Sequence, residues 1–505
     1  MTGQGTDKRT PYRIVIVGGG TAGWMAAALL SRLLPQQAYA ITLIESDEIG
    51  TVGVGEATIP QLQLLNAVLG IDEDEFLRAT QGSYKLGIEF VGWGTAESRY
   101  IHAFGNTGHA IGQTPFHHFW LRGQRLGETA SLDAYCLNAA AAYADKFARG
   151  AAAQSKMLGG LVHAFHFDAG LYAQFLRRRA EPQGVCRVEG RITHAERDGE
   201  TGDVAAVVLA DGTRHAAELF VDCSGFRGLL IEEALATGYE DWTHWLPCDR
   251  ALAVPSARLP DITPYTRSTA KRAGWQWRIP LQGRTGNGHV YCSAAIGDDE
   301  AASLLLSGLD GAPLADPRML RFTTGRRKNF WNRNVVALGL AAGFMEPLES
   351  TSIHLVQSAI ERVLKYLPNG PIRAADVAAY NAETIFEWER VRDFIVLHYH
   401  ANARPEPFWR ECAAMAVPDS LAAKLELFRA NGRIVRAGEE LFSEPGWLQV
   451  MVGQGVVPAG YHPLADGPSD ADLRDYLALV RQTVAKHVAG MPDHAAFLAQ
   501  HCRSG

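Results

Sequence analysis

The stretch Arg13-Ile14-Val15-Ile16-Val17-Gly18-Gly19-Gly20-Thr21-Ala22-Gly23 decides the fold of this chain. Its first five residues form a short apolar, mostly β-branched run, which is typical of a buried strand. The glycines that follow fit the pattern G-x-G-x-x-G, with Gly18, Gly20 and Gly23 at its fixed positions. In such a loop the backbone can approach a pyrophosphate, and the N-terminus of the next helix offers free N–H groups to it. Residues 24–34, rich in Ala and Leu, predict that helix.

A second strand follows at the expected distance and ends in an acid. The run Ile41-Thr42-Leu43-Ile44 precedes Glu45, which lies 22 residues after Gly23. That spacing suits a carboxylate that holds a ribose 2′-OH. Strand, loop, helix, strand and acid in this order argue against a plain glycine-rich turn. They predict a dinucleotide-binding module instead.

Composition narrows the class of protein. The chain has 505 residues, of which 47% are hydrophobic and 20% charged, with a net charge of −7. These values are typical of a globular protein with more than one module, and they argue against a nucleic-acid partner. No apolar run reaches the roughly 20 residues of a membrane span, and residues 1–11 lack the apolar core of a signal peptide, so we expect a cytoplasmic protein. The seven cysteines contain no C-x-x-C pair, which favours neither a disulfide framework nor a metal site.

The rest of the chain supplies further pieces of the same module. Residues 50–60 (G-T-V-G-V-G-E-A-T-I-P) form a second glycine-rich loop, expected to line the ligand crevice through Gly55, Glu56, Ala57 and Thr58. Residues 187–221 show short alternating runs that predict an antiparallel β-meander with a hairpin turn at Asp211-Gly212. Residues 219–225 and 334–339 return to the pattern of a buried strand followed by glycine.

This layout resembles flavoproteins of the glutathione-reductase type and predicts an α/β fold with a parallel sheet plus a β-meander. We expect an FAD-binding module over residues 1–370, with substrate-binding segments inserted at about 61–185 and 230–330. Residues 371–505 are expected to form a helical C-terminal module packed on it. The chain beyond residue 353 is mainly helical by pattern, with a looped interval near 443–466.

Trp275-Gln276-Trp277-Arg278-Ile279-Pro280 is unusual, because the chain has only 11 tryptophans. In a strand, alternation places both indoles and Ile279 on one face. Pro280, which has no N–H to donate, would end the pairing. Taken alone, this segment is better interpreted as an aromatic core strand.

Four segments together resemble one family. They are G-G-G-T-A-G-W at 18–24, G-V-G-E-A-T-I-P at 53–60, W-Q-W-R-I-P at 275–280 and P-L-E-S-T at 347–351. From residue 13 to about 400 the chain resembles the flavin-dependent halogenases, in particular the tryptophan-halogenase-like group. The resemblance implies an FADH2-dependent oxidoreductase that oxidises a halide ion with O2 to hypohalous acid and halogenates an electron-rich, indole-like aromatic. A separate flavin reductase would supply the reduced flavin, since the chain has one nucleotide fingerprint.

Lys85, in the segment Tyr84-Lys85-Leu86-Gly87, matches the family's essential lysine. Its implied role is to capture hypohalous acid, either as a haloamine or through a hydrogen bond. A lysine suits this role because its stem is flexible and its pKa falls readily on burial. From the sequence alone, a solvated surface lysine would be the better interpretation, although alternation with Leu86 places Lys85 on the other face of a strand.

By the same resemblance, Glu349 is the carboxylate that works with the lysine and stabilises the cationic ring intermediate. Glu346 competes with it, since it also stands in an apolar segment. Either acid could instead be a charge at a helix N-terminus, with Ser350 or Thr351 as the cap. Thr351 and Ser352 match the segment whose backbone N–H groups hold the halide. The best-known members carry Gly where this chain has Ser352.

Other matches concern the cofactor and the substrate. Gly339 and Leu340 stand where flavin hydroxylases carry Gly-Asp, which shifts weight away from a hydroxylase. Trp275 and Trp277 would wall the flavin side. The family matches of His102 and Phe104 line the indole pocket, although packing beside a turn explains both equally well.

Two alternatives remain at this stage. One is a flavin-dependent aromatic monooxygenase, and the other is a non-catalytic protein that binds flavin or an aromatic ligand. The remaining histidines, His117, His118, His163, His166, His398 and His400, fit no metal motif and are interpreted as packing or surface residues. A homodimer is compatible with the sequence, which does not determine the oligomeric state.

Overall fold

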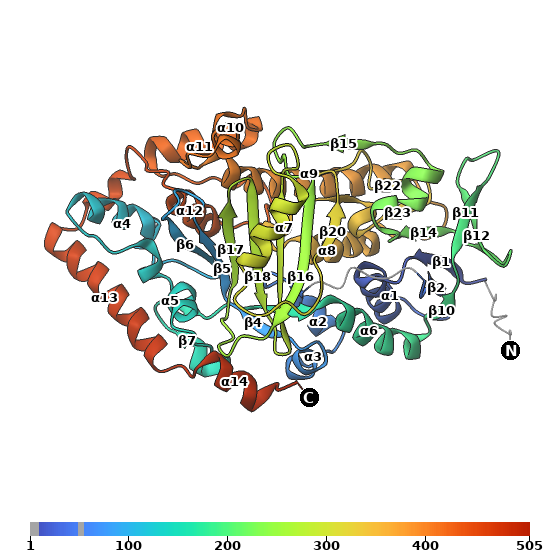
Figure 1. The fold of residues 1–505 in the computed structure, drawn as a ribbon, viewed down its shortest axis with the longest axis horizontal. Coiled ribbons are helices and arrows are strands. Elements are labelled where there is room, and N and C mark those ends of the chain that lie inside the picture. Colours follow the sequence, from blue (N-terminus) through green and yellow to red (C-terminus); the bar gives the residue numbers. More distant parts are fainter. Residues whose placement is uncertain (1–9, 49–54, 505) are drawn as a thin grey trace, which may run out of the picture.

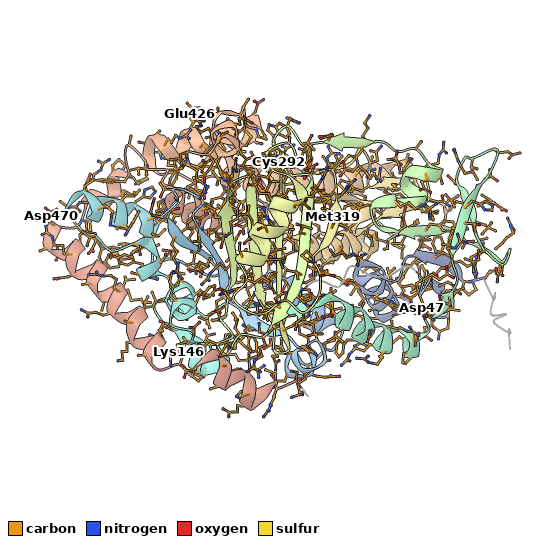
Figure 2. All side chains as sticks on the ribbon, in the orientation of Figure 1. Asp47, Lys146, Cys292, Met319, Glu426 and Asp470 are labelled. Atoms are coloured by element: carbon orange, nitrogen blue, oxygen red, sulfur yellow. The ribbon has the colours of Figure 1, made fainter. Side chains whose placement is uncertain are left out.

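The computed structural model describes residues 10–48 and 55–504. Two large sheets dominate it (Figure 1). The left half of that view contains the helices α4 (Phe116–Arg125), α10 (Pro407–Ala414), α11 (Asp419–Asn431), α12 (Glu444–Gly453) and α13 (Asp470–Ala489). Side chains fill the space between these layers (Figure 2). Within the described residues, no helix is both long and apolar enough to cross a membrane.

The first large sheet contains the strand that opens the glycine motif. Its order is β10-β2-β1-β14-β23-β22, and all neighbours are parallel except β22 with β23. Strand β1 lies inside this sheet, and its last four residues, 14–17, are apolar and buried in the core. The helices α1 and α6 pack together beside this sheet. The bounds are β1 (Tyr12–Val17), β2 (Tyr39–Glu45), β10 (Cys186–Glu189), β14 (Leu219–Asp222), β22 (Trp331–Asn332), β23 (Val335–Ala337), α1 (Thr21–Leu33) and α6 (Ala169–Ala180).

A small antiparallel meander follows β10, as the sequence predicts, but it is shorter than expected. It consists of β11 (Ile192–Arg197), β12 (Val204–Leu209) and β13 (Arg214–Ala216), with Gly212 in the left-handed region at the hairpin turn. The two ends of the predicted stretch 187–221 belong to the parallel sheet instead, as β10 and β14. A four-residue edge strand has too few alternations to reveal which sheet it joins. The α/β class with a parallel sheet and a separate meander is confirmed.

The second large sheet carries the tryptophan pair. Its order is β20-β16-β19-β18-β17-β5-β6, antiparallel except between β17 and β5. Trp275, Trp277 and Ile279 are all buried, as alternation predicts, and Pro280 is the last residue of its strand. Helix α7 packs on this sheet against β16 and β19. The bounds are β5 (Gly87–Val91), β6 (Arg99–Ala103), β16 (Arg250–Ala257), β17 (Thr266–Lys271), β18 (Gly274–Pro280), β19 (Arg284–Tyr291), β20 (Arg318–Arg321) and α7 (Asp298–Ser307).

A three-stranded sheet, ordered β3-β9-β4, lies beside the second large sheet. It corrects part of the predicted loop 50–60: Gly55–Ala57 forms strand β3, paired with β9 (Ala164–Asp168), while residues 50–54 lie outside the described residues. Strands β3 and β19 approach closely at Gly286 of β19, where an added Cβ would lie 3.3 Å from the backbone of Gly55. Strand β4 (Ser83–Lys85) pairs on the other side of β9.

Several short strands complete the sheets. They are β7 (Gln154–Ser155) with β8 (Gly159–Gly160), and β15 (Tyr239–Asp241) with β21 (Gly325–Arg327) and β24 (Gly343–Phe344).

Helices account for most of the remaining chain. Helix α12 contradicts the first part of the expected looped interval near 443–466, because it runs from Glu444 to Gly453. Ser443 caps this helix by accepting from the N–H of Gly446, and Gly453 is needed where the helix crosses the ring of Tyr100. The bounds are α2 (Leu62–Val68), α3 (Glu73–Ala79), α4 (Phe116–Arg125), α5 (Leu137–Tyr143), α8 (Ser352–Lys365), α9 (Ala374–His400), α10 (Pro407–Ala414), α11 (Asp419–Asn431), α12 (Glu444–Gly453), α13 (Asp470–Ala489) and α14 (His494–His501).

The C-terminal helices also contact residues from the first third of the chain. Lys146, labelled in Figure 2, pairs with Asp493 just before α14 at 2.6 Å. The division of the chain into modules at about residue 370 stays a prediction.

Two glycines of the fingerprint allow a matched test of local packing. A Cβ on Gly23 would lie 1.9 Å from the carbonyl oxygen of Gly18, whereas a Cβ on Gly20 would meet nothing within 4 Å. We expect Gly23→Ala to lower the free energy of unfolding by about 1–3 kcal/mol, as overpacking does. Gly20→Ala should leave it nearly unchanged. Thermal or urea unfolding of both variants measures the difference, and equal stabilities would contradict this account of the helix–strand contact.

Candidate active site

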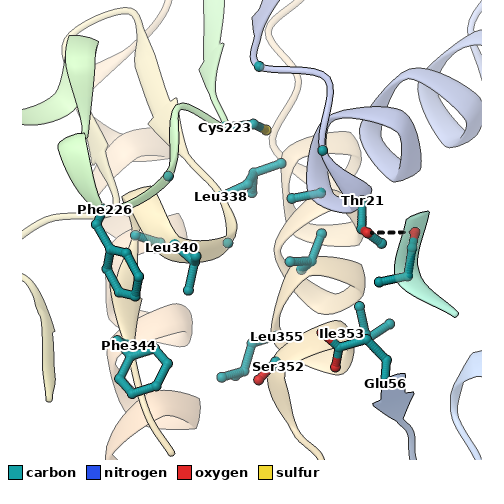
Figure 3. A pocket seen from close by; sticks show the side chains of 18 of the residues that line it. Thr21, Glu56, Cys223, Phe226, Leu338, Leu340, Phe344, Ser352, Ile353 and Leu355 are labelled. Carbon is teal, nitrogen blue, oxygen red and sulfur yellow. Dashed lines mark hydrogen bonds between the residues drawn. The ribbon is translucent and has the colours of Figure 1, made fainter. Parts of the chain in front are cut away.

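A cavity of about 860 Å³ opens where the strands of the parallel sheet end (Figure 3). Eleven of the residues expected from the sequence line it: Gly18, Gly20, Glu45, Gly55, Glu56, Ala57, Trp275, Trp277, Gly339, Leu340 and Ser352. Gly23, Thr58 and Thr351 are described in the structure but do not line it. The segments that meet here are far apart in sequence, which is what a binding crevice at the carboxyl ends of parallel strands requires.

The glycine motif fits a phosphate group. Gly18 adopts a φ of +108°, which favours glycine. Gly20, at the N-terminus of α1, faces open space, and no side chain caps this helix. The first N–H groups of α1 are therefore available to an anion. Gly23 serves packing rather than ligand contact.

Glu45 stands beside the motif at the cavity. Its Oε2 accepts from Trp24 Nε1 at 3.3 Å, and its Oε1 accepts from Arg187 Nε at 2.5 Å. An ionised carboxylate can accept further hydrogen bonds, so it can still hold a sugar hydroxyl. The Arg187 partner was not expected, because it lies in β10, which the pattern assigned to the meander.

Trp275 and Trp277 form one wall of the same cavity. Their ring centroids are 6.0 Å apart, and both side chains are buried. Trp277 lies against Gly288 of the neighbouring strand, where any Cβ would come within 2.0 Å of the ring. Trp275 is held differently, through a 2.7 Å hydrogen bond from its Nε1 to Glu346 Oε2.

Lys85 is fully buried, which excludes a surface lysine. Its Nζ donates to the carbonyl oxygen of Thr58 at 2.9 Å and to Ser350 Oγ at 2.7 Å. The ammonium also lies 5.4 Å from the centre of the Phe104 ring. Burial lowers the pKa of Lys85 to about 7, against the opposing attraction of Glu349. Because Ser350 also lines the cavity, this hydroxyl connects the cavity to the lysine.

Glu349 is clasped by two histidines. Its Oε2 lies 2.7 Å from His102 Nδ1, and its Oε1 lies 2.8 Å from His398 Nε2. Burial alone would raise the pKa of Glu349, but the attraction and hydrogen bonds of His102 and His398 outweigh it and lower the pKa to about 2. The carboxylate is therefore charged at neutral pH.

His398 was interpreted as a packing or surface residue, and this interpretation is wrong. Its other ring nitrogen, Nδ1, lies 2.8 Å from the carbonyl oxygen of Phe394, which accepts only from an N–H. Its Nε2 lies 2.8 Å from Glu349 Oε1, so the side chain contacts the carboxylate. No sequence signal points to His398, because it lies 49 residues after Glu349 in an ordinary helical pattern.

Glu346 is also fully buried, but its partners are neutral. Burial raises its pKa to about 7, only partly offset by hydrogen bonds from Tyr399 and Trp275. The two candidate carboxylates therefore differ in charge, and only Glu349 is firmly anionic. Within the described residues, no hydrogen bond or ion pair joins Glu346 to Lys85.

The expected substrate residues lie next to this pair. Phe104 is the ring below Lys85, and His102 contacts Glu349. The His102 ring lies 5.3 Å from Phe394 and 6.1 Å from Phe442, between centroids. Trp447 of α12 adds an edge-on contact to Phe394. Phe394 and Phe442, from the C-terminal part of the chain, thus pack against the histidine that contacts the acid.

The segment that was expected to hold the halide, Thr351 and Ser352, lies at the start of α8. The alternative with a side-chain cap does not hold: Thr351 occupies the N-cap position, but its side chain makes no cap hydrogen bond, and Ser350 Oγ accepts from Lys85. Ser352 lines the cavity at the first turn of the helix. Figure 3 shows Ser352 beside Leu355 on the cavity side. Among the described residues, no group of side chains is arranged to hold a metal ion.

Comparison with known proteins agrees with this site. The family model described as "Tryptophan halogenase" matches residues 13–470. Tryptophan 7-halogenase RebH of Lentzea aerocolonigenes is 35% identical, with 92% of this chain and 93% of that protein covered. The structure of Xcc4156, a flavin-dependent halogenase from Xanthomonas campestris, is 50% identical with a TM-score of 0.95, covering 98% of this chain and 99% of that one. BrvH, a flavin-dependent halogenase from Brevundimonas sp. BAL3, is 45% identical with a TM-score of 0.94, covering 97% and 99%. The chain belongs to the tryptophan halogenase family and is a flavin-dependent halogenase.

Proposed function

We propose that this enzyme halogenates an electron-rich, indole-like ring with hypohalous acid that passes from the flavin cavity to Lys85. The single observation that carries the proposal is the bond from Lys85 Nζ to Ser350 Oγ, since Ser350 also lines the cavity. Relatives named as tryptophan halogenases support an indole as the substrate class.

The cavity fits FAD. Gly18 and Gly20 with the start of α1 would hold the pyrophosphate, and Glu45 would hold the ribose. Bound in its reduced form, the flavin supplies the reducing equivalents with which O2 and a halide give hypohalous acid. A separate reductase would provide that reduced flavin. The start of α8, at Thr351 and Ser352, would hold the halide. Gly55, Glu56, Ala57, Gly339 and Leu340 would line the flavin.

Lys85 is the proposed acceptor of the acid. With a pKa near 7, both its amine and its ammonium form are available at neutral pH. The neutral amine can take the halogen from hypohalous acid, forming an N–halogen bond and releasing water. The ammonium can instead hold the acid by a hydrogen bond. Both routes place the electrophilic halogen above Phe104.

Glu349 is proposed to stabilise the positive ring that forms when the arene attacks the halogen. A carboxylate with a pKa near 2 is a poor proton acceptor but a permanent negative charge, so its contribution is electrostatic. His102 and His398 hold both of its oxygens in place.

One reaction tests this function. The enzyme is incubated with a flavin reductase, NADH, FAD, O2, bromide or chloride and a set of indoles including tryptophan, and products are read by mass spectrometry. A halogen isotope pattern that depends on the added halide is expected. A hydroxylated product would indicate a monooxygenase, and FAD binding without any product would indicate a binding protein.

Lys85→Met should abolish halogenation while reduced flavin is still oxidised. It should also stabilise the fold, because a buried ammonium is replaced by an apolar chain of similar length. The folded pKa lies below the unfolded value, so the unfolded state binds more protons between pH 7 and about 10.5. The gain in stability should therefore be largest below pH 7 and shrink as the pH rises. Product mass and thermal unfolding across pH measure both effects.

Lys271→Met is the matched control, because burial also lowers the pKa of Lys271 and it lies outside the cavity lining. It should leave product formation intact. A Lys85→Met enzyme that halogenates at the wild-type rate would remove Lys85 from the mechanism. A wild-type rate that rises through pH 7 would favour the amine, and one that falls would favour the ammonium.

Glu349→Gln should lower kcat by about 10²–10³, the range for loss of one electrostatic stabiliser. The amide keeps the shape of the side chain but removes its charge. Glu387→Gln is a control of similar kind, because Glu387 is also held by a histidine, His354, and its pKa is also lowered to about 2. Steady-state product formation compares the two, and an equal loss of rate would show that Glu349 acts only through the fold.

Because of Ser352, we expect the enzyme to incorporate more bromine than chlorine into its product when both halides are present at equal concentration. Its side chain occupies space at the start of α8 where relatives carry glycine, and bromide, which is less tightly hydrated and more easily oxidised, tolerates an imperfect site better. Ser352→Gly should narrow the gap, and Ser352→Ala separates the effect of the hydroxyl from that of bulk. Isotope patterns of the products from a mixed-halide reaction measure the ratio of bromination to chlorination in each variant. Chloride incorporation that equals or exceeds bromide would contradict the prediction.

A further inference from the structure

Glu346 connects Trp275 to Tyr399 and has no role in the halogenation chemistry proposed above. Its Oε2 accepts two hydrogen bonds, from Trp275 Nε1 at 2.7 Å and from the Tyr399 hydroxyl at 2.5 Å. Its Oε1 is buried and has no hydrogen-bond partner among the described residues. The Tyr399 hydroxyl in turn lies 3.4 Å from Cys248 Sγ.

This arrangement suits a neutral carboxylic acid. An acid has one oxygen that only accepts and another that carries the proton. Here both donors meet at one oxygen, and no cation contacts the group within the described part of the chain. A buried charge without a cation would be costly. Burial accordingly raises the pKa of Glu346 to about 7.

Trp275 depends on this acid for its orientation. The indole N–H is the only polar group of its side chain, and Glu346 is its hydrogen-bond acceptor. Its ring also packs near two other indoles, with Trp93 at 6.3 Å and Trp277 at 6.0 Å between centroids. Ring contacts of this kind fix direction less strictly than a short hydrogen bond does. The Trp277 ring, by contrast, occupies the space beside Gly288 that any Cβ would fill.

We propose that Glu346 is a positioning residue for the flavin wall, whose carboxyl oxygen locks the Trp275 indole in place between the cavity and the aromatic cluster behind it. The wall then leaves the side at Ser350 and Lys85 as the exit for hypohalous acid. This inference rests on the proposed function. It assigns to Glu346 a task different from that of Glu349, although both acids are fully buried and three residues apart.

The hydrogen bond itself is tested first, in flavin-free protein labelled with ¹⁵N at the tryptophan indoles. Trp275→Phe assigns the Trp275 N–H signal by its disappearance. Glu346→Leu removes the acceptor and should move that signal strongly upfield. Glu346→Gln offers an amide oxygen and should move it little, while Tyr399→Phe should leave it in the hydrogen-bonded range. An unchanged Trp275 signal in Glu346→Leu would overturn the proposal.

The consequence is tested by the share of oxidised flavin that ends as halogenated product rather than hydrogen peroxide. Glu346→Leu should lower that share by roughly five- to tenfold, the range for loss of one buried hydrogen bond. The KM for the aromatic should stay unchanged. Glu346→Gln should restore the share nearly to the wild-type value, because the amide copies the donors and acceptors of the neutral acid.

Other outcomes also decide the question. If Glu346→Leu does not fold, Trp275→Phe, which keeps an aromatic ring but lacks the N–H, provides the same partition measurement. If Glu346→Gln loses halogenation as completely as Glu349→Gln, Glu346 takes part in the chemistry and the positioning role is wrong. If the wild-type enzyme forms no halogenated product, the proposed function fails, yet the indole signal still shows whether Glu346 holds Trp275.

Discussion

The hydrogen bond from Lys85 to Ser350 joins two segments that are 265 residues apart, and the rest of the site is arranged around it. A lysine ammonium loses its hydration when it is fully buried, and among the described residues this one gains two neutral oxygens, a nearby ring and the attraction of Glu349. Such a group survives burial by giving up its proton readily, which is why its pKa falls. Ser350 holds its hydroxyl toward the lysine from a left-handed backbone conformation, with a φ of +60° that a non-glycine residue rarely adopts.

Two carboxyl groups three residues apart are driven to opposite states by their neighbours. Glu349 meets two histidine rings and is held as an anion, while Glu346 meets an indole N–H and a phenol and is held close to neutrality. Glu346 precedes the short turn η7 (Pro347–Glu349) and Glu349 ends it, and the two carboxyl groups have different partners. One short segment thus carries one firmly anionic carboxylate and one whose pKa burial raises to about 7. Identical side chains acquire separate tasks purely through burial and partners.

The sequence revealed the parts whose chemistry is local. The glycine fingerprint places β1, α1 and the cavity, because its geometry depends on consecutive residues. The alternation of Trp275 and Trp277 likewise predicted that one strand face bears both indoles. The partners that settle the carboxylates could not be predicted, since His102, His398 and Tyr399 reach them only through tertiary packing. Helix α12 was missed because its glycines, which read as loop residues, are there to let the helix approach Tyr100 and His102.

Helix α9 contributes side chains of the C-terminal part of the chain directly to the candidate active site. His398 and Tyr399 are adjacent in this 27-residue helix, and they reach Glu349 and Glu346 respectively. Further up the same helix, Thr384 and Trp388 line the flavin cavity. Successive residues on a helix point about 100° apart, so one turn can contact both carboxyl groups only if it lies directly behind the segment that bears them. The position of α9 therefore supplies one partner to each acid, while His102 of β6 and Trp275 of β18 supply the other.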